Sequence, residues 1–346
     1  MRRHLNTLYV TTEGAWLRKD GENVVVKVDG DERGRVPVHL LGGVVCFGPV
    51  GMTPALMGHC AECGVSVSML GRNGRFLARV EGRTSGNVLL RRAQYRATDD
   101  VATTAKLAGH MVTGKLLNQR TVVRRALRDH GAKMAPDGRE RLDMCERRLT
   151  DAARRSARTL ATDAIRGIEG EAARVYYAVL DDLILDEDRA FTFRGRSRRP
   201  PLDPVNALLS FLYTLLVHDC RSALETVGLD PAVGYLHRER PGRPSLALDL
   251  MEELRPVLAD RLVLSLINRR QLRARDFEAS VSGAVTMRDD ARRSVLVAYQ
   301  DRKKDEILHP FLKEKTTLGL VPFVQASLLA RHLRGELDAY PPFLWR

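Results

Sequence analysis

Residues 203–218 read D-P-V-N-A-L-L-S-F-L-Y-T-L-L-V-H. Asp203 can cap a helix and Pro204 suits a first helical turn, while the apolar residues that follow recur three and four positions apart. The pattern ends near Gly228, a residue type that suits a helix C-terminus. This stretch therefore predicts a long core helix at the centre of a helical domain.

The chain around this helix keeps a helical apolar period from about Val88 onward. Further helices are predicted at about 100–130, 139–163, 170–186, 245–270 and 290–308. We therefore predict a larger, all-α-helical domain over residues 88–346.

Residues 1–87 follow a different pattern, with short alternating runs rich in β-branched residues. Strands are predicted at 24–28, 36–40 and 44–47, hairpin turns at Asp29-Gly30 and Asn73-Gly74, and one helix between Thr53 and Gly64. Strands first and helices after, without alternation, argue against a doubly wound sheet. The predicted fold class is α+β and multidomain, with a small β-rich N-terminal domain.

Length and composition restrict the protein class. The chain has 346 residues, 44% of them apolar, which suffices for packed cores and excludes wholesale disorder. Its longest apolar run covers residues 207–217, well short of the ~20 residues that cross a bilayer, and its first residues do not form a secretory signal. Five cysteines, with one C-x-x-C at Cys60 and Cys63 and no second pair, favour structural thiols over a metal site. We expect a cytoplasmic protein without membrane contact.

The charge balance points to a polyanionic partner. The chain has 56 basic and 43 acidic residues, and the net charge is +13. Residues 89–130 alone hold nine basic and three acidic residues. Such a local excess favours nucleic acid. The candidate DNA contacts are Lys115, a helical stripe of Arg120, Arg124 and Arg128, and a loop cluster of Arg194, Arg196, Arg198 and Arg199. For the stripe, a solvated helix face is the alternative interpretation.

Two short motifs suggest other enzymes and are not favoured. Gly109 to Lys115 has the spacing of a phosphate-binding loop, but Leu116 stands where such a loop needs Ser or Thr. His218-Asp219 matches the core dipeptide of some metal phosphohydrolases. A helix-end pair without metal is the favoured interpretation of that dipeptide.

Acidic residues on either side of the central helix offer a metal site. Glu169 lies in R-G-I-E-G at 166–170, where it could instead cap a helix start. Asp249 and Glu252 lie three residues apart on one helix face, downstream of His237. Two carboxylates and an imidazole suit Mg²⁺ or Mn²⁺, whereas the alternative is the polar side of an amphipathic helix. Spacing does not bring Glu169 to His237, and helical rotation does not choose between Glu252 and Glu253.

Several blocks taken together resemble the CRISPR adaptation integrase family, the universal CRISPR-associated endonuclease of spacer acquisition. They are R-G-I-E-G at 166–170, R-R-P-P-L-D-P-V-N-A-L-L-S-F-L-Y at 198–213, V-G-Y-L-H at 233–237 and S-L-A-L-D-L-M-E-E-L-R-P at 245–256. The closing segments H-P-F-L at 309–312 and Y-P-P-F-L-W-R at 340–346 are similar to the type I-C branch.

This resemblance implies roles that spacing does not supply. It implies that Glu169, His237 and Glu252 bind Mg²⁺ or Mn²⁺ with Asp249 close by, and that the β-rich domain forms a homodimer. It also implies an endonuclease and integrase that joins the 3′-hydroxyl ends of captured double-stranded DNA to a CRISPR repeat by transesterification. The implied partner is a small ferredoxin-like CRISPR-associated protein. The alternative from another class is a non-enzymatic, basic nucleic-acid-binding protein.

Overall fold

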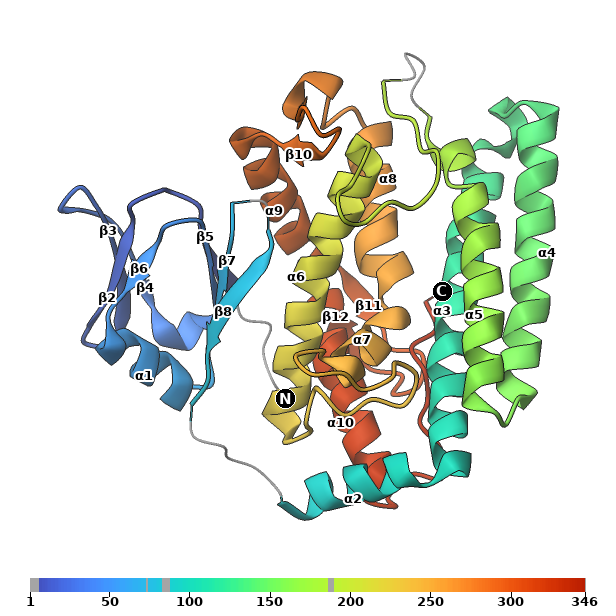
Figure 1. Ribbon diagram of the computed structural model, residues 1–346, viewed down its shortest axis with the longest axis horizontal. Helices are drawn as coiled ribbons and strands as arrows, with labels where there is room; N and C mark the ends of the chain where they lie inside the picture. The colour runs from blue at the N-terminus through green and yellow to red at the C-terminus, as the bar shows by residue number, and fades with distance from the viewer. Residues whose placement is uncertain (1–5, 73, 83–87, 186–189, 346) are drawn as a thin grey trace.

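The computed structural model describes residues 6–72, 74–82, 88–185 and 190–345. A β-rich N-terminal domain stands beside a larger helical domain (Figure 1). This is the order of strands and helices that the sequence predicts. The first helix of the larger domain, α2, covers Val88–Asp99.

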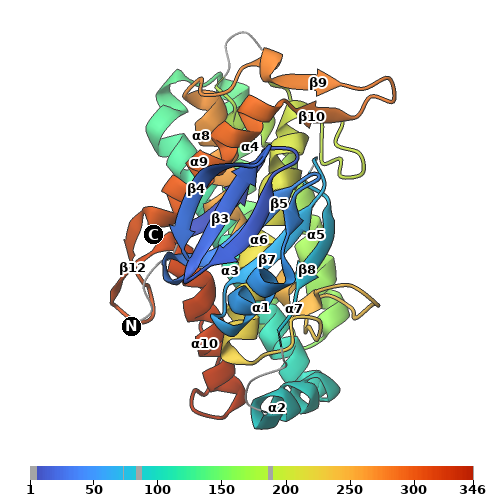
Figure 2. The same cartoon turned by 90° about the vertical axis from the view of Figure 1, so that its left-hand side faces the viewer.

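The N-terminal domain contains two four-stranded sheets, in the orders β1-β5-β7-β8 and β4-β3-β2-β6. The strands are β1 (Asn6–Val10), β2 (Trp16–Asp20), β3 (Asn23–Val28), β4 (Asp31–Pro37), β5 (Leu41–Phe47), β6 (Gly51–Met52), β7 (Ser66–Leu70) and β8 (Phe76–Val80). Most of their buried apolar side chains and those of helix α1 (Pro54–Glu62) form a core of their own, whereas Val45, Phe47 and Leu70 join the core of the helical domain. Turning the molecule brings this domain in front of the helices (Figure 2).

Local signals account for much of this domain. Asp29 and Gly30 have positive φ angles of 52° and 89° in the hairpin between β3 and β4, as predicted. The Thr53 hydroxyl accepts a hydrogen bond from the Leu56 amide at the start of α1. The predicted turn at 73–74 falls partly outside the described residues, and β7 and β8 pair antiparallel on either side of it.

One predicted strand is wrong at its end. The chain leaves the sheet at Pro37, and Val38–Leu40 form a 3₁₀ turn instead of continuing the expected strand at 36–40. Pro37 has no amide hydrogen to donate to a neighbouring strand, so the ladder stops there.

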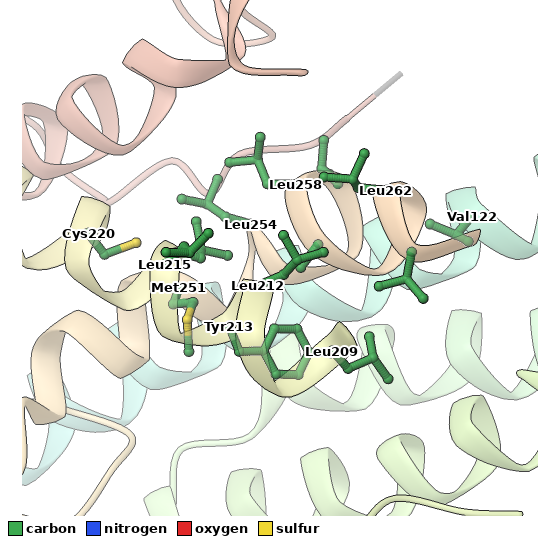
Figure 3. Close-up of a cluster of buried hydrophobic side chains, with 14 of the residues drawn as sticks. Val122, Leu209, Leu212, Tyr213, Leu215, Cys220, Met251, Leu254, Leu258 and Leu262 are labelled. Carbon is green, nitrogen blue, oxygen red and sulfur yellow. The ribbon is translucent and has the colours of Figure 1, made fainter. Parts of the chain in front are cut away.

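The helical domain surrounds α6 (Pro204–Val227), the predicted core helix. Its N-terminus is capped by Asp203, and Gly228 ends it in the left-handed conformation. The other helices are α3 (Val101–His130), α4 (Pro136–Arg158), α5 (Thr162–Ala178), α7 (Ser245–Glu252), α8 (Arg261–Asn268), α9 (Asp289–Lys304) and α10 (Val321–Leu333). Leucines of α6 pack against Leu254, Leu258 and neighbouring apolar side chains (Figure 3). Helices α3, α4 and α5 pack together beside this core.

Two short antiparallel strand pairs interrupt the helices, which the all-helical expectation did not include. They are β9 (Phe277–Ala279) with β10 (Val285–Met287), and β11 (Glu306–Leu308) with β12 (Lys315–Thr317). In the described part of the chain, no helix is long and apolar enough to cross a membrane.

Several helix boundaries differ from the prediction, among them the start of α5 and the end of α7. Helix α5 begins at Thr162, not near residue 170, because packing against α3 and α4 outweighs the cost of about 1 kcal/mol for each glycine inside it. The helix expected over 245–270 is interrupted, and Arg255–Asp260 form a wider π-helical segment between α7 and α8. Pro256 lies at this break, where its ring disfavours a regular α-helical turn.

Candidate metal centre

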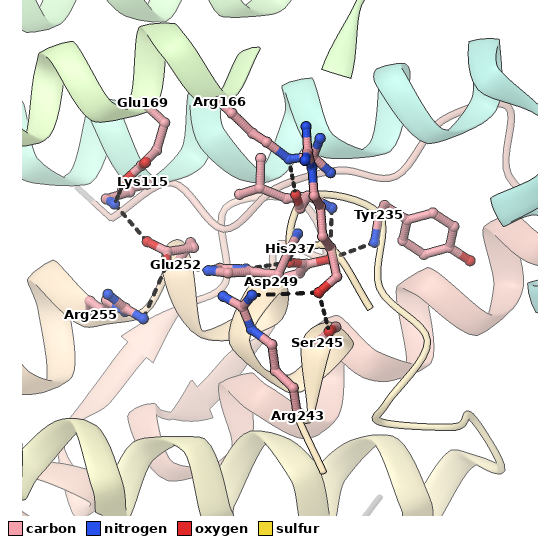
Figure 4. Close-up of polar contacts among 12 residues, drawn as sticks. Lys115, Arg166, Glu169, Tyr235, His237, Arg243, Ser245, Asp249, Glu252 and Arg255 are labelled. Atoms are coloured by element: carbon pink, nitrogen blue, oxygen red, sulfur yellow. Dashed lines mark hydrogen bonds and ion pairs between the residues drawn. The ribbon is translucent and has the colours of Figure 1, made fainter. Parts of the chain in front are cut away.

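Three helices bring a lysine and two glutamates together in the interior. Lys115 lies on α3, Glu169 in the middle of α5, and Glu252 at the end of α7 (Figure 4). The Lys115 Nζ lies 2.7 Å from Glu252 Oε2 and also forms an ion pair with Glu169 Oε1. The two glutamates that the sequence singled out therefore converge on one cation.

Glu252 is buried and ionised. Arg255 Nη2 lies 3.1 Å from Glu252 Oε1, on the side chain's other oxygen from Lys115. Burial alone would raise the pKa of Glu252, but the charges of Arg255 and Lys115 outweigh it and hold the pKa well below its ordinary value. Burial alone would lower the pKa of Lys115, but the negative charges of Glu252 and Glu169 raise it above its ordinary value. This part of the site therefore keeps its charges at neutral pH.

Asp249 fixes the orientation of His237. Its carboxylate accepts hydrogen bonds from the amides of Tyr235, Leu236 and His237, at 2.6, 2.9 and 2.9 Å. His237 Nδ1 lies 2.6 Å from the same carboxylate, and since an ionised Asp249 has no proton to give, Nδ1 must donate. In the neutral imidazole this arrangement leaves the lone pair on Nε2, which lies 3.9 Å from Glu252 Oε1.

The loop before His237 is shaped for this arrangement. A Cβ on Gly234 would lie 2.7 Å from Asp249 Oδ2, so a side chain there would displace the carboxylate. Arg166 of α5 donates from Nε to the carbonyl of Leu236, which ties the loop to the helix that carries Glu169. The carboxylate of Asp249 is occupied by its donors and can orient the imidazole without serving as a ligand itself.

The donor types fit a hard divalent cation. Two carboxylates and one imidazole nitrogen face a common region, and the cation already between the carboxylates shows that they are arranged around positive charge. In the described part of the chain, no three His, Cys, Asp or Glu side chains stand close enough together to hold a metal ion as they are. Metal binding therefore requires Lys115 to share or yield the two carboxylates.

The structure separates Glu252 from Glu253, which helical rotation left equivalent. Glu253 is fully buried on the opposite side of the chain, where it accepts hydrogen bonds from the Tyr340 hydroxyl, the Gln325 amide at 3.1 Å and the Phe343 amide at 2.6 Å. Burial raises the pKa of Glu253 to about 7. Its partners are neutral donors, so it has a structural environment, whereas Glu252 faces the cations.

Glu169 is not a helix cap, contrary to one interpretation of its motif. It lies inside α5, and a Cβ on either Gly167 or Gly170 would meet no other described atom within 4 Å. The two glycines leave the helix surface beside Glu169 open.

Two of the predicted DNA contacts need revision. Lys115 is only 4% exposed and is held between carboxylates, so it does not present its charge on the surface. Arg196 packs inside its loop, donating to Asn206 Oδ1 at 2.6 Å and to Ser210 Oγ at 3.1 Å. Its guanidinium also lies over the ring of Tyr213. The sequence alone did not indicate these partners of Lys115 and Arg196.

The basic stripe on α3 is partly neutralised by its surroundings. Arg120 is half-buried and lies 3.5 Å from the Thr150 hydroxyl, and Arg124 lies 3.9 Å from Glu146 of α4. Arg128 pairs with Asp129 at 2.8 Å. The sequence showed only the last of these partners, because α4 packs against α3 from elsewhere in the chain.

A second group of arginines differs from the stripe in its surroundings. A surface pocket of about 540 Å³ is lined by Arg174, Arg194 and Arg198. Helix α5 forms one side of this pocket, where it contributes Arg174 and Tyr177. Within residues 6–72, 74–82, 88–185 and 190–345, none of the three forms an ion pair with a carboxylate. Arg199, the next residue along the chain, is also exposed. Arg174, Arg194 and Arg198 therefore keep charges that the arginines of the stripe share with α4 and Asp129.

Arg174 and Arg255 were missed by the sequence analysis. Arg255 follows Glu252 by three residues on the helical path, a spacing that could have indicated the pair. Arg174 gave no signal, because only the return of the loop at 193–198 toward α5 makes its position meaningful.

The other motifs noted in the sequence lie in ordinary structural surroundings. His218 Nδ1 lies 3.5 Å from the Ser68 hydroxyl of the β-rich domain, and Asp219 binds Lys303 Nζ at 2.9 Å. Gly109 to Lys115 lie within α3, so they form no phosphate-binding loop. Cys60 is buried and Cys63 is exposed.

Sequence relatives of this chain are CRISPR-associated endonucleases. It is 60% identical over 347 residues to CRISPR-associated endonuclease Cas1 2 of Rhodospirillum rubrum, covering 100% of both chains. It is 55% identical to CRISPR-associated endonuclease Cas1 1 of Chlorobaculum tepidum, again over 100% of both.

Solved structures share the fold at low sequence identity. A CAS1 protein from Thermotoga maritima is 22% identical, with a TM-score of 0.81 over 97% of this chain and 99% of that one. A casposase bound to integration product is 21% identical, with a TM-score of 0.82 over 99% and 95%. A chain of a Cas6-RT-Cas1–Cas2 complex is 24% identical, with a TM-score of 0.81 over 100% of this chain and 36% of that one.

The family model described as CRISPR associated protein Cas1 matches residues 8–301. This match extends over both domains up to α9 and includes Glu169, His237, Asp249 and Glu252. None of these comparisons tests the predicted type I-C branch, which stays a prediction. The chain belongs to the Cas1 family of CRISPR-associated proteins.

Proposed function

We propose that this chain is a divalent-metal-dependent DNA endonuclease and integrase that inserts captured DNA fragments into a CRISPR array. The observation that carries the proposal is the convergence of Glu169 and Glu252 on one cation position beside the oriented imidazole of His237. The names of its Cas1 relatives as endonucleases support nuclease chemistry. The casposase of the same fold, which is bound to an integration product, makes strand joining a natural extension.

In this proposal, Glu169, His237 and Glu252 hold Mg²⁺ or Mn²⁺. Such an ion, when bound, supplies Lewis-acid stabilisation of the negative charge that develops at a phosphodiester during transesterification. Asp249 keeps His237 in the tautomer with its Nε2 lone pair free. Arg255 keeps Glu252 ionised from the side away from Glu169. A DNA 3′-hydroxyl is the nucleophile, so the chain needs no serine or cysteine for this role.

The proposed substrate is double-stranded DNA, both the captured fragment and the CRISPR repeat. Arg174, Arg194 and Arg198 lie on the α5 side of the site, and no carboxylate of the described residues pairs with them. Guanidinium groups in such a position contact phosphates and contribute little sequence discrimination. We therefore expect DNA binding with weak sequence preference and steep salt dependence.

The proposed assembly is a homodimer formed through the β-rich domain, joined by a small ferredoxin-like CRISPR-associated partner. Trp16 and Leu77 are 51% and 59% exposed on strands of that domain, and β8 lies at the edge of its sheet. Exposed edges and apolar side chains are usually covered. The solved complex that contains Cas1 and Cas2 supports a partner of this kind. Light scattering at micromolar concentration should give a dimer, and a monomer would contradict this part of the proposal.

A strand-transfer assay tests the function. The reaction contains a short duplex with 3′-hydroxyl ends and a supercoiled plasmid that carries a CRISPR repeat, with Mn²⁺ or with EDTA. We expect joined products with the wild-type chain only when Mn²⁺ is present, and none with Glu252→Gln. Duplex binding without any metal-dependent product would favour the alternative, a non-enzymatic nucleic-acid-binding protein.

A further inference from the structure

Residues 340–345 form an irregular segment that is nevertheless buried in the helical domain. Tyr340 and Phe343 are each 1% exposed. The Phe343 amide donates to Glu253 Oε2 at 2.6 Å, and its carbonyl accepts from Asn118 Nδ2 at 2.8 Å. The Trp345 amide donates to Asn118 Oδ1 at 2.7 Å. The segment is therefore held by polar bonds as well as by apolar burial.

Asn118 joins this segment to the end of α7. It is fully buried on α3, and its Nδ2 also donates to the carbonyl of Glu253 at 2.7 Å. One amide side chain of α3 thus binds both the residue after Glu252 and the segment 340–345. We call Asn118, Glu253 and residues 340–345 the clamp.

The clamp lies directly behind the acidic site. Glu253 belongs to the clamp while its neighbour Glu252 faces Lys115. On α3 the same relation holds, because a Cβ on Gly114 would lie 3.0 Å from Pro342 Cβ and 3.2 Å from Glu253, while Lys115 points to the site. A shift of the clamp must therefore move the backbone on which Lys115 and Glu252 stand.

We propose that the clamp is a positioning device for Glu252, because it fixes the backbone that turns this carboxylate toward Lys115, Glu169 and His237. The clamp touches no substrate and acts through the backbone of residues 252–253. Outer residues that orient metal ligands commonly change metal affinity by about 10–100-fold when altered. This inference rests on the proposed metal site and adds to it the residues that set its geometry.

Mn²⁺ affinity, measured by electron paramagnetic resonance on the full chain without DNA, tests this role. Asn118→Asp replaces the Nδ2 donor with an oxygen that faces two carbonyls, and we expect Mn²⁺ binding to weaken by at least about tenfold. Tyr340→Phe keeps the ring but removes the hydroxyl that donates to Glu253, and we expect a loss of about two- to tenfold. If Asn118→Asp does not fold, Tyr340→Phe decides the outcome.

Leu149→Ala is the matched control. Leu149 is fully buried on α4, a helix that carries no clamp residue and no proposed metal ligand, so we expect its loss to lower the melting temperature without removing a polar contact of either. We expect its Mn²⁺ affinity to stay within about twofold of wild type. A weaker Mn²⁺ affinity in the clamp variants would then not be explained by loss of stability alone. Wild-type affinity in both clamp variants would overturn the inference. Mn²⁺ binding that Glu252→Gln does not weaken would instead refute the proposed metal site.

Discussion

Glu252 and Glu253 are adjacent, identical in chemistry and both buried, yet they lie in opposite environments. Glu252 meets Lys115 and Arg255, and it is held ionised. Glu253 meets hydroxyl and amide donors, and burial raises its pKa to about 7. The difference shows that the partners of each carboxylate, most of them on distant segments, decide its charge, because the two residues and their helix are the same.

The largest effect on strand transfer is expected when Glu252 and Glu253 are replaced one at a time. Glu252→Gln should reduce strand transfer to background at any Mn²⁺ concentration, since the variant lacks a ligand oxygen with full negative charge. Glu253→Gln keeps one acceptor oxygen, enough for Tyr340 and Gln325 but not also for the Phe343 amide, so we expect a partial loss that excess Mn²⁺ recovers. Titrating Mn²⁺ in the strand-transfer assay measures both. A dead Glu253→Gln beside an active Glu252→Gln would reverse the two assignments.

Glu253→Ala is not a neutral control for Glu252→Gln. Removing the carboxylate leaves the Tyr340 hydroxyl and the Phe343 amide buried without their acceptor, whereas the Gln325 amide still donates to the Pro341 carbonyl. Each donor left without an acceptor costs about 1–3 kcal/mol. The glutamine variant keeps one acceptor oxygen and avoids part of that loss.

A smaller loss is expected for Asp249, which touches both the loop and His237. Asp249→Asn replaces one acceptor oxygen with a donor opposite amides and removes the charge that fixes the imidazole tautomer. We expect strand transfer to fall by about 10–100-fold. The rate measured at saturating Mn²⁺ checks this. A rate equal to that of the dead Glu252→Gln would mean that Asp249 acts as a ligand.

The two basic regions offer a further comparison. Replacing Arg174, Arg194 and Arg198 with Ala should flatten the log–log salt dependence of duplex binding by about one unit for each phosphate that the variant no longer neutralises. Arg120 and Arg124 have partners on α4 and should change the slope less. Arg141→Ala is the control, because Asp182 already binds that guanidinium. An unchanged slope in the triple variant would remove the pocket from the DNA path.

The smallest effect concerns stability at the contact between the domains. Burial lowers the pKa of His218 to about 4, with Arg221 and Arg79 adding to the shift and Asp219 opposing it. The unfolded chain binds a proton at this residue below about pH 6.5, whereas the folded chain does not until about pH 4. Stability is therefore complete above pH 6.5 and falls as the pH decreases toward 4.

Urea unfolding of wild type and His218→Gln at pH 7 and pH 4.5 measures the contribution of His218 to the free energy of unfolding. Wild type should lose about 2–3 kcal/mol more than the variant between the two pH values, at about 1.4 kcal/mol per pKa unit. Equal losses in both proteins would show that His218 is not kept neutral by the fold.

Sequence signals that act locally were sufficient for much of the fold. The Asp203 cap and Gly228 end of α6, and the Thr53 cap of α1, are contacts between near neighbours, so their residue types predicted them. The start of α5 was missed because its glycines suggested a boundary that tertiary packing overrides. Local signals fail where distant elements decide.

The candidate site shows the same limit. The sequence singled out Glu169, His237 and Glu252 through their resemblance to a family, while spacing alone left them unconnected. Lys115 was expected at the DNA surface because its burial depends on α5 and α7, which lie far along the chain. Arg196 was misjudged for the same reason, since Asn206 and Ser210 are its partners only after the loop folds back.

The central claim is that Glu169, His237 and Glu252 form one divalent-cation site. Anomalous scattering from Mn²⁺ in crystals of the wild-type chain tests it most directly, with Glu252→Gln crystals treated alike. The account predicts a single strong peak between the two carboxylates and His237 Nε2, absent from the variant, with Lys115 displaced from at least one carboxylate. A peak elsewhere, or Lys115 still holding both carboxylates at saturating Mn²⁺, would contradict it.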